Sequence, residues 1–109
     1  MARESLGEFE QLVLLAILRL GDEAYGVPIV DEIEGRTNRR VSRPAVYIAL
    51  RRLGKKRLVS SNLAEPTPEQ GGRAKTYYRV EKAGLNLLAE SRHDLLNMWQ
   101  GLSLVLDNR

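Results

Sequence analysis

Residues 39–59 read RRVSRPAVYIALRRLGKKRLV and contain eight Lys or Arg residues but no Asp or Glu. The wider window of residues 35–64 holds nine of the 17 basic residues of the chain and none of its 14 acidic residues. The rest of the chain is therefore acidic, and the positive charge is local. Such a separation is typical of a surface that faces a polyanion.

The same stretch has the apolar spacing of a helix. Ser42 is a suitable N-cap, and Pro44 is tolerated in a first helical turn. At about 100° per residue, Val46, Leu50 and Leu53 fall within about 60° of one another and form the buried stripe. We therefore expect a helix over residues 43–56. Its opposite face presents Pro44, Ile48, Arg51, Arg52 and Lys55.

The composition is that of one small globular domain. The chain has 109 residues, of which 43% are hydrophobic and 28% charged, as is ordinary for a folded domain. It has no cysteine, which excludes disulfides and thiolate metal sites and makes the cytoplasm the expected location. The longest apolar run, residues 12–18, is too short to span a membrane, and no secretory signal precedes it. We expect no cofactor and no metal, because a single histidine gives no cluster of ligands.

Two helices are expected before the basic stretch. Ser5 and Glu8 have the spacing of a capping box, which predicts a helix from about residue 5 to residue 20. Apolar residues surround most of this helix, which indicates burial on more than one side and, in so small a domain, contact with a second chain. A second helix is expected over residues 27–36, with Val30 and Ile33 toward the core.

A hairpin is expected after the basic helix. The segments LVSSNLAE (residues 58–65) and KTYYRV (residues 75–80) have the composition of strands. The residues between them are rich in Pro and Gly, which predicts an exposed loop at the tip of the hairpin.

The last helix is expected over residues 82–106. Seven of its residues are spaced alternately by three and four, which is the row of a coiled coil over about three heptads. Because such a row needs a partner helix, we expect it to form a dimer interface. Gly101 within it weakens the expectation of one unbroken helix. The row consists of Leu85, Leu88, Arg92, Leu95, Trp99, Leu102 and Leu106.

This order of elements describes a mainly α (α+β) fold, a winged helix-turn-helix with a two-stranded wing and a C-terminal dimerisation helix. We expect residues 1–80 to form a DNA-binding domain and residues 81–109 to form the dimerisation helix. The third helix follows a short turn and has an exposed basic face, as a recognition helix in a major groove has.

Arg43 has the donors to bind guanine O6 and N7 together. Ser42, Tyr47 and the first amides of the third helix suit phosphates. Packing is the alternative role for Tyr47, and ordinary wing solubility is the alternative for the two wing residues. The candidate DNA contacts are Ser42, Arg43, Tyr47, Arg51, Arg52, Lys55, Arg73 and Lys75.

An enzyme is not expected. His93 lies beside Asp94 in the last helix, and no nucleophile accompanies them at a suitable position. Two classes of function remain. One is a sequence-specific DNA-binding regulator, and the other is a winged-helix protein-interaction module whose basic face meets an acidic partner without reading DNA.

Three segments taken in order resemble the PadR family of bacterial winged-helix transcriptional regulators across about residues 6–90. They are LLAILRLGDEAYGVPIVDEI, VSRPAVYIALRRLGKKRLV and GGRAKTYYRVEKAGLNLL. The resemblance implies a homodimer that binds inverted-repeat operators in double-stranded DNA, usually as a repressor, with a C-terminal helix exchanged between protomers. Some members of the family bind flat aromatic effectors at the dimer interface. Trp99 is the candidate contact for such a molecule, and simple packing is its alternative role.

Three positions depart from the family pattern. Pro44 and Arg57 stand where Gly is common, and Glu81 stands where Thr or Ser usually caps the last helix. An Arg in the left-handed conformation costs roughly 1 kcal/mol more than Gly. Either Arg57 avoids that conformation or the protein tolerates the strain.

Overall fold

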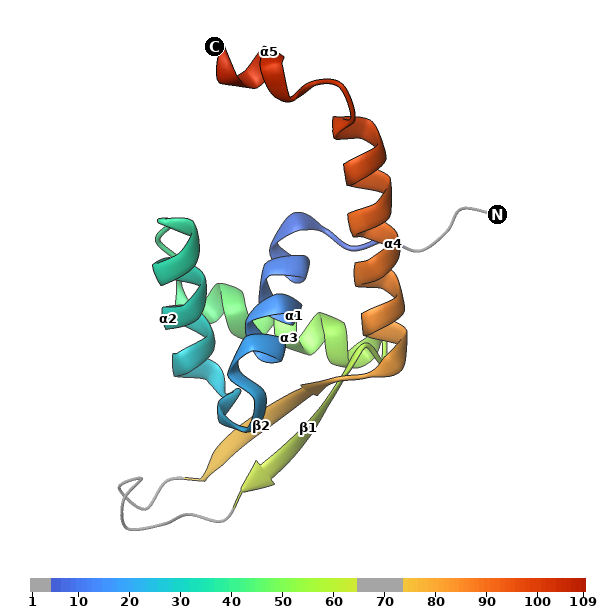
Figure 1. Ribbon diagram of the computed structural model, residues 1–109. Coiled ribbons are helices and arrows are strands. Elements are labelled where there is room, and N and C mark those ends of the chain that lie inside the picture. The colour runs from blue at the N-terminus through green and yellow to red at the C-terminus, as the bar shows by residue number, and fades with distance from the viewer. Residues whose placement is uncertain (1–4, 65–73) are drawn as a thin grey trace.

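The computed structural model describes residues 5–64 and 74–109 and has the winged helix-turn-helix architecture (Figure 1). Helices α1, α2 and α3 form the body, a two-stranded sheet forms the wing, and α4 leads away from the body. In chain order the elements are α1 (Glu8–Leu20), the 3-10 helix η1 (Gly21–Glu23), α2 (Gly26–Thr37), α3 (Arg43–Lys55), β1 (Val59–Ala64), β2 (Lys75–Val80), α4 (Lys82–Trp99) and α5 (Ser103–Asp107). Among the described residues, no helix is long and apolar enough to cross a membrane.

Helix α1 begins at Glu8, so the predicted N-cap at Ser5 is wrong. Gly7 is the N-cap residue, and its amide donates a hydrogen bond to Glu10 Oε1 at 3.1 Å. Glu8 instead pairs with Arg39, which lies far away in the sequence. The carboxylate that accepts from the N-cap amide is therefore that of Glu10, not that of Glu8.

One apolar core joins the three helices and the base of the wing. The stripe expected on α3 is confirmed, since Val46, Leu50 and Leu53 are all buried, as are Val30 and Ile33 of α2. Leu58 and Val59 extend this core into the wing. Burial of these aliphatic side chains is the main favourable contribution to folding.

The turn between α2 and α3 is fixed by local hydrogen bonds. Asn38 ends α2 in the left-handed conformation, with φ of 57°, which Asn adopts more readily than most residues. The carboxylate of Glu34 accepts a hydrogen bond from the backbone N–H of Val41 at 2.8 Å. These contacts set the direction in which the chain enters α3.

Arg57 is in the left-handed conformation directly after α3, with φ of 61°. The strain is therefore tolerated. The amide of Leu58 donates to the carbonyl of Leu53 at 2.9 Å, and that of Arg57 donates to the carbonyl of Gly54 at 3.0 Å. This is the hydrogen-bond pattern of a Schellman motif, and it turns Leu58 into the core.

Strands β1 and β2 are antiparallel, with Val59 opposite Val80 at the base of the wing and Ala64 opposite Lys75 toward its tip. The hairpin predicted from the sequence is confirmed. The wing is tied to the body, because the amide of Tyr78 donates to the carbonyl of Ala24 at 2.8 Å.

The predicted single helix over residues 82–106 is wrong, because α4 ends at Trp99. Gly101 has φ of 83°, a conformation that Gly adopts at little cost and that breaks the helix. Leu102 lies in this break and Leu106 lies in the short helix α5, so the expected row of seven is not carried by one helix. Glu81 stands at the N-cap of α4 without a capping hydrogen bond from its side chain.

Candidate nucleic-acid interface

The start of α3 is held by its cap. Ser42 Oγ accepts a hydrogen bond from the amide of Ala45 at 3.2 Å, which confirms the predicted N-cap. Pro44 stands in the first turn, where its missing N–H costs no hydrogen bond. Arg43 and Ser42 are both exposed at this end. The positive end of the helix dipole thus opens onto solvent beside a guanidinium group.

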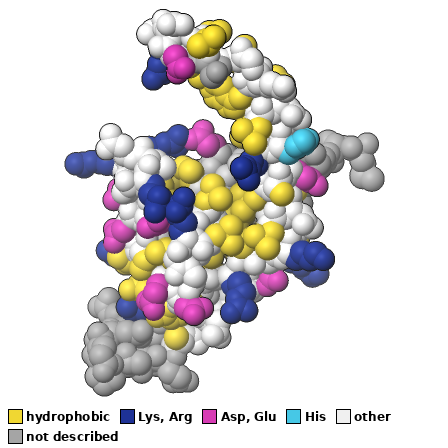
Figure 2. Space-filling view, in the orientation of Figure 1, with side chains coloured by type: hydrophobic (Ala, Val, Ile, Leu, Met, Phe, Trp, Pro, Cys, Tyr) yellow, Lys and Arg dark blue, Asp and Glu magenta, His cyan; other side chains and the backbone are white. Residues whose placement is uncertain are grey.

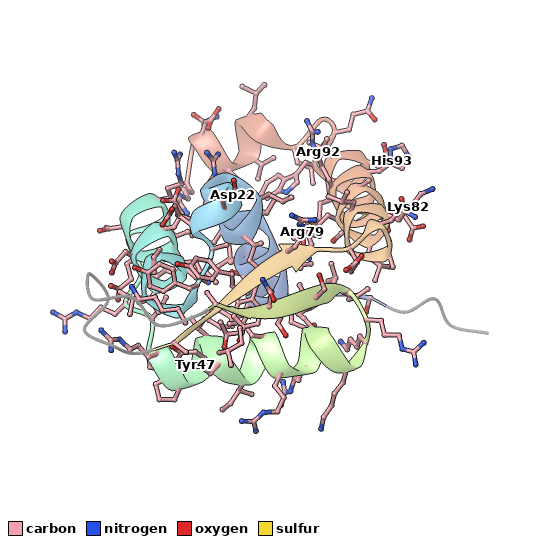
Figure 3. All side chains as sticks on the ribbon, turned by 90° about the horizontal axis from the view of Figure 1, so that it is seen from below. Asp22, Tyr47, Arg79, Lys82, Arg92 and His93 are labelled. Carbon is pink, nitrogen blue, oxygen red and sulfur yellow. The ribbon has the colours of Figure 1, made fainter. Side chains whose placement is uncertain are left out.

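The outward face of α3 is basic. Arg51, Arg52 and Lys55 are exposed, on the side of the helix opposite its buried stripe. Figure 3 shows side chains that end in nitrogen projecting from α3 away from the body. The structure therefore brings together four of the residues predicted for DNA contact, with Arg43 at the tip of the helix and the other three along its side. We call these three residues the basic face of α3.

Internal ion pairs neutralise part of the basic window of residues 35–64. Three of its nine basic residues are paired with glutamates: Arg36 with Glu32 at 2.7 Å, Arg39 with Glu8, and Lys56 with Glu10 at 3.1 Å. The other six form no ion pair within residues 5–64 and 74–109. They are Arg40, Arg43, Arg51, Arg52, Lys55 and Arg57.

Arg40 was not singled out from the sequence. It is exposed in the turn just before Ser42, beside Arg39, whose charge is paired with Glu8. The sequence signal was the pair RR at residues 39 and 40, but only the structure distinguishes the paired arginine from the unpaired one.

Tyr47 packs against α2 as well as facing solvent. Its hydroxyl and part of its ring fill the space that a side chain at Gly26 would need, and its exposed fraction is 44%. Its ring also lines a groove between α3 and the wing, together with Tyr78. Burial raises the pKa of the Tyr78 phenol, and the neighbouring Tyr47 adds to the rise. The Tyr78 hydroxyl is therefore protonated at neutral pH.

The wing residue Lys75 contacts an aromatic ring at the tip end of the described strands. Its ammonium group lies 4.2 Å from the ring centre of Tyr25, a cation–π contact. Tyr25 in turn contacts Tyr77 edge to face, with ring centres 5.4 Å apart. These contacts join the wing to the start of α2. Arg73, the other predicted wing contact, lies outside the described residues.

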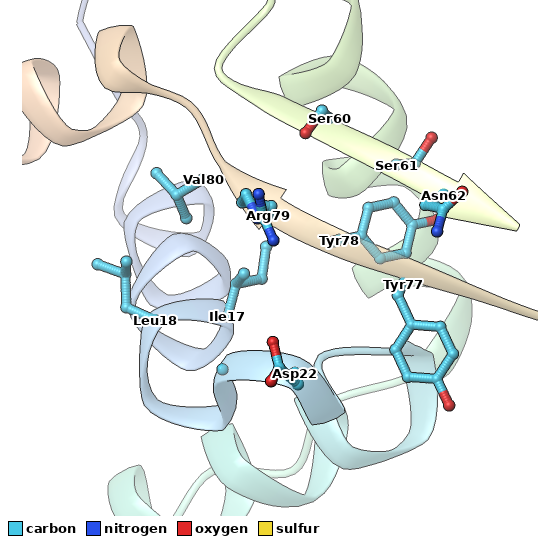
Figure 4. Close-up of a pocket in the computed structure, with 11 residues that line it drawn as sticks. Ile17, Leu18, Asp22, Ser60, Ser61, Asn62, Tyr77, Tyr78, Arg79 and Val80 are labelled. Carbon is cyan, nitrogen blue, oxygen red and sulfur yellow. The ribbon is translucent and has the colours of Figure 1, made fainter. Parts of the chain in front are cut away.

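A cleft of about 590 Å³ lies between the end of α1 and the wing. Figure 4 shows Asp22 at one wall and Arg79 at the other, with the apolar side chains of Ile17 and Leu18 behind them. The cleft thus combines both signs of charge with apolar surface, and it does not continue the basic face of α3.

The residues predicted for the dimer interface are largely uncovered in the single chain. On α4, Leu85, Leu95 and Trp99 are 44%, 51% and 47% exposed, whereas Leu88 packs partly against the core. Arg92 is exposed on the same helix. Figure 2 shows hydrophobic side chains gathered on the face between the body and the C-terminal arm. Leu15 of α1 is among the exposed hydrophobic side chains.

The chain matches one family model and several solved structures. The model is described as "Transcriptional regulator PadR-like family" and matches residues 14–90. A PadR family transcriptional regulator from Eggerthella lenta is 25% identical with a TM-score of 0.68, over 94% of this chain and 88% of that one. A PadR-like transcriptional regulator from Bacillus cereus is 24% identical with a TM-score of 0.67, over 92% of this chain and 88% of that one.

A transcriptional regulator from Clostridium thermocellum is 22% identical with a TM-score of 0.69, over 84% of this chain and 85% of that one. At this level of identity the likeness shows the fold. No curated protein is similar enough in sequence to match the chain.

Proposed function

Because the chain belongs to the PadR-like family of transcriptional regulators, we propose that it binds double-stranded DNA sequence-specifically through α3. Members of this family are transcriptional regulators, so the chain is a regulator and not an enzyme. The observation that carries the proposal is the set of basic residues on and beside α3 that pair with no acidic residue in the described part of the chain. In contrast, ion pairs hold Arg36, Arg39 and Lys56.

The geometry of α3 supports a division of roles. Arg43 at the first turn reaches base edges in the major groove, where its two donors match guanine O6 and N7. The hydroxyl of Ser42 and the amide of Arg43 bind a phosphate, since Pro44 has no N–H and the amide of Ala45 donates to Ser42 Oγ. The basic face of α3 binds the flanking phosphates, and Arg73 and Lys75 of the wing add electrostatic contacts. Tyr47 fixes the position of α3 by packing against Gly26. The exposed part of its ring contacts the sugar-phosphate backbone of the DNA.

We further propose that the protein is a homodimer that represses transcription from an inverted-repeat operator in the cytoplasm. The uncovered row on α4 supports this proposal, because exposed leucines at coiled-coil spacing are stabilised by a second copy of the same helix. Residues 1–80 then act as the DNA-binding part and residues 81–109 as the dimerisation part. The interface consists of Leu85, Leu88, Arg92, Leu95, Trp99, Leu102 and Leu106.

Selection of bound fragments from a random duplex pool tests the DNA-binding proposal. We expect inverted repeats whose half-sites are spaced by about one helical turn. Arg43→Ala should relax the sequence preference, whereas Arg51→Ala should weaken all sequences similarly. Equal effects of the two variants would refute the division of roles. Failure to bind any duplex at low salt would favour a protein-interaction module instead.

Trp99 also provides a test of an effector. It is the single tryptophan of the chain, so fluorescence excited selectively at tryptophan reports on it alone. A planar aromatic effector that stacks between two copies of Trp99 should quench this fluorescence and weaken operator binding at the same concentrations. Absence of quenching would leave Trp99 as a packing residue, and quenching without a change in operator affinity would show a ligand that is not an effector.

A further inference from the structure

Ile48 is an exposed aliphatic side chain on the outward side of α3, between Arg43 at the tip and the basic face of α3. Its exposed fraction is 49%. It does not belong to the apolar core or to the partly buried residues that pack against it. Tyr47 is also exposed on α3, but its packing against Gly26 accounts for its position. Ile48 instead lies on the side of α3 opposite the buried stripe.

Helix geometry places Ile48 at the centre of the outward ridge. It lies about 180° around the helix from the middle of the stripe formed by Val46, Leu50 and Leu53. Arg51 and Arg52 follow it by three and four residues and lie about 50° to either side of the outward direction. Ile48 is about one and a half turns from the start of α3, within the half of a recognition helix that contacts base edges.

The chemistry of this side chain limits what it can recognise. Isoleucine has no hydrogen-bond donor or acceptor, so placing it against the amino or carbonyl group of a base would bury a polar group without a partner. The C5-methyl group of thymine is the apolar feature of the major-groove edge of a base pair. We propose that Ile48 is a specificity-determining residue that packs on a thymine methyl group in each half-site. This inference rests on the proposed insertion of α3 into the major groove.

Replacement of thymine by deoxyuridine tests the contact directly, because it removes the methyl group and keeps every hydrogen-bonding group of the base. The full-length chain is used with the duplex obtained by selection, and each thymine of one half-site is replaced in turn. The wild-type protein should lose about fourfold in affinity at one thymine, the value for one buried methyl contact. Ile48→Ala should bind the thymine and deoxyuridine duplexes equally well.

Two variants are matched controls. Arg51→Ala should bind more weakly but keep the fourfold preference for thymine, since it removes a phosphate contact and leaves Ile48 in place. Ile48→Val should keep part of the preference. Because Ile48 is 49% exposed and lies on the side of α3 opposite the buried stripe, its variants should stay folded, which a melting temperature close to that of the wild type verifies.

Equal affinity of the wild-type protein for thymine and deoxyuridine at every position would overturn the role of Ile48 and leave DNA binding intact. An unchanged thymine preference in Ile48→Ala would overturn it as well. If no duplex is bound, the proposed function itself fails and this inference fails with it. The three outcomes are distinguishable in the same binding assay.

Discussion

Helices α3 and α4 are both amphipathic, but only the apolar side of α3 is buried within the chain. The stripe of α3 is buried by α1, α2 and the wing of the same chain. The row of α4 is uncovered beyond its first turns, where Gly84 and Leu88 meet the rest of the chain. An apolar row in water lacks the burial that stabilises it. The comparison teaches that the apolar stripe of α3 is buried within one chain, whereas burial of the row on α4 depends on the second copy that we propose.

The largest expected effect is on the free energy of unfolding. Its loss on substitution should depend on protein concentration for α4 but not for α3. Leu53→Ala leaves a cavity in the core and should lower the free energy of unfolding by about 2–5 kcal/mol at every concentration. Leu95→Ala should destabilise the protein only where the dimer is populated, since a dimer is stabilised by mass action. Urea denaturation at two protein concentrations measures both. A loss for Leu95→Ala that is the same at both concentrations would contradict the comparison.

A smaller effect tests the contact that anchors the start of α4 against the wing. A Cβ atom at Gly84 would lie 2.6 Å from the carbonyl oxygen of Leu58, so Gly84→Ala should push α4 away from the wing and cost about 1–3 kcal/mol. Gly35→Ala in α2 is the matched control, because no atom lies within 4 Å of its added Cβ, and it should gain up to about 1 kcal/mol. Thermal melting compares the two variants. A stabilised Gly84→Ala protein would show that α4 is not anchored at this point.

The smallest effect concerns the residue that ends α3. Arg57→Gly relieves the left-handed backbone and should raise the free energy of unfolding by about 1 kcal/mol. Arg57→Lys keeps the positive charge and the strain, so its stability should stay at the wild-type value. Denaturation at high salt removes the contribution of surface charge. If Arg57→Lys stabilises the protein as much as Arg57→Gly, the gain does not come from the backbone.

Local patterns predicted much of the fold. The cap at Ser42, the stripe of α3 and the hairpin depend on residues close in sequence, and each is present. The predicted cap of α1 is wrong because the helix begins at Glu8, and Glu10 accepts the hydrogen bond from the amide of Gly7. The predicted last helix failed because a regular row of leucines does not reveal the left-handed backbone of Gly101.

The candidate site was predicted less completely than the fold. The charge pattern identified the basic window, but it did not show which of its residues are paired with glutamates of α1 and α2. Lys75 was expected to face a nucleic acid, and the structure places its ammonium group over Tyr25. Such contacts join residues far apart in the chain, so a sequence pattern does not contain them.

The central claim is that the basic face of α3 binds the phosphates of DNA, and the salt dependence of duplex binding tests it most directly. Each phosphate contact contributes about −0.9 to the slope of log affinity against log salt, so about six contacts per protomer give a slope near −5. The double variant Arg51→Ala and Arg52→Ala loses two phosphate contacts, so the magnitude of its slope should be smaller by about two. Arg36→Ala, which removes a charge already paired with Glu32, should keep the wild-type slope. An unchanged slope in the double variant, or an equal change in Arg36→Ala, would contradict the account.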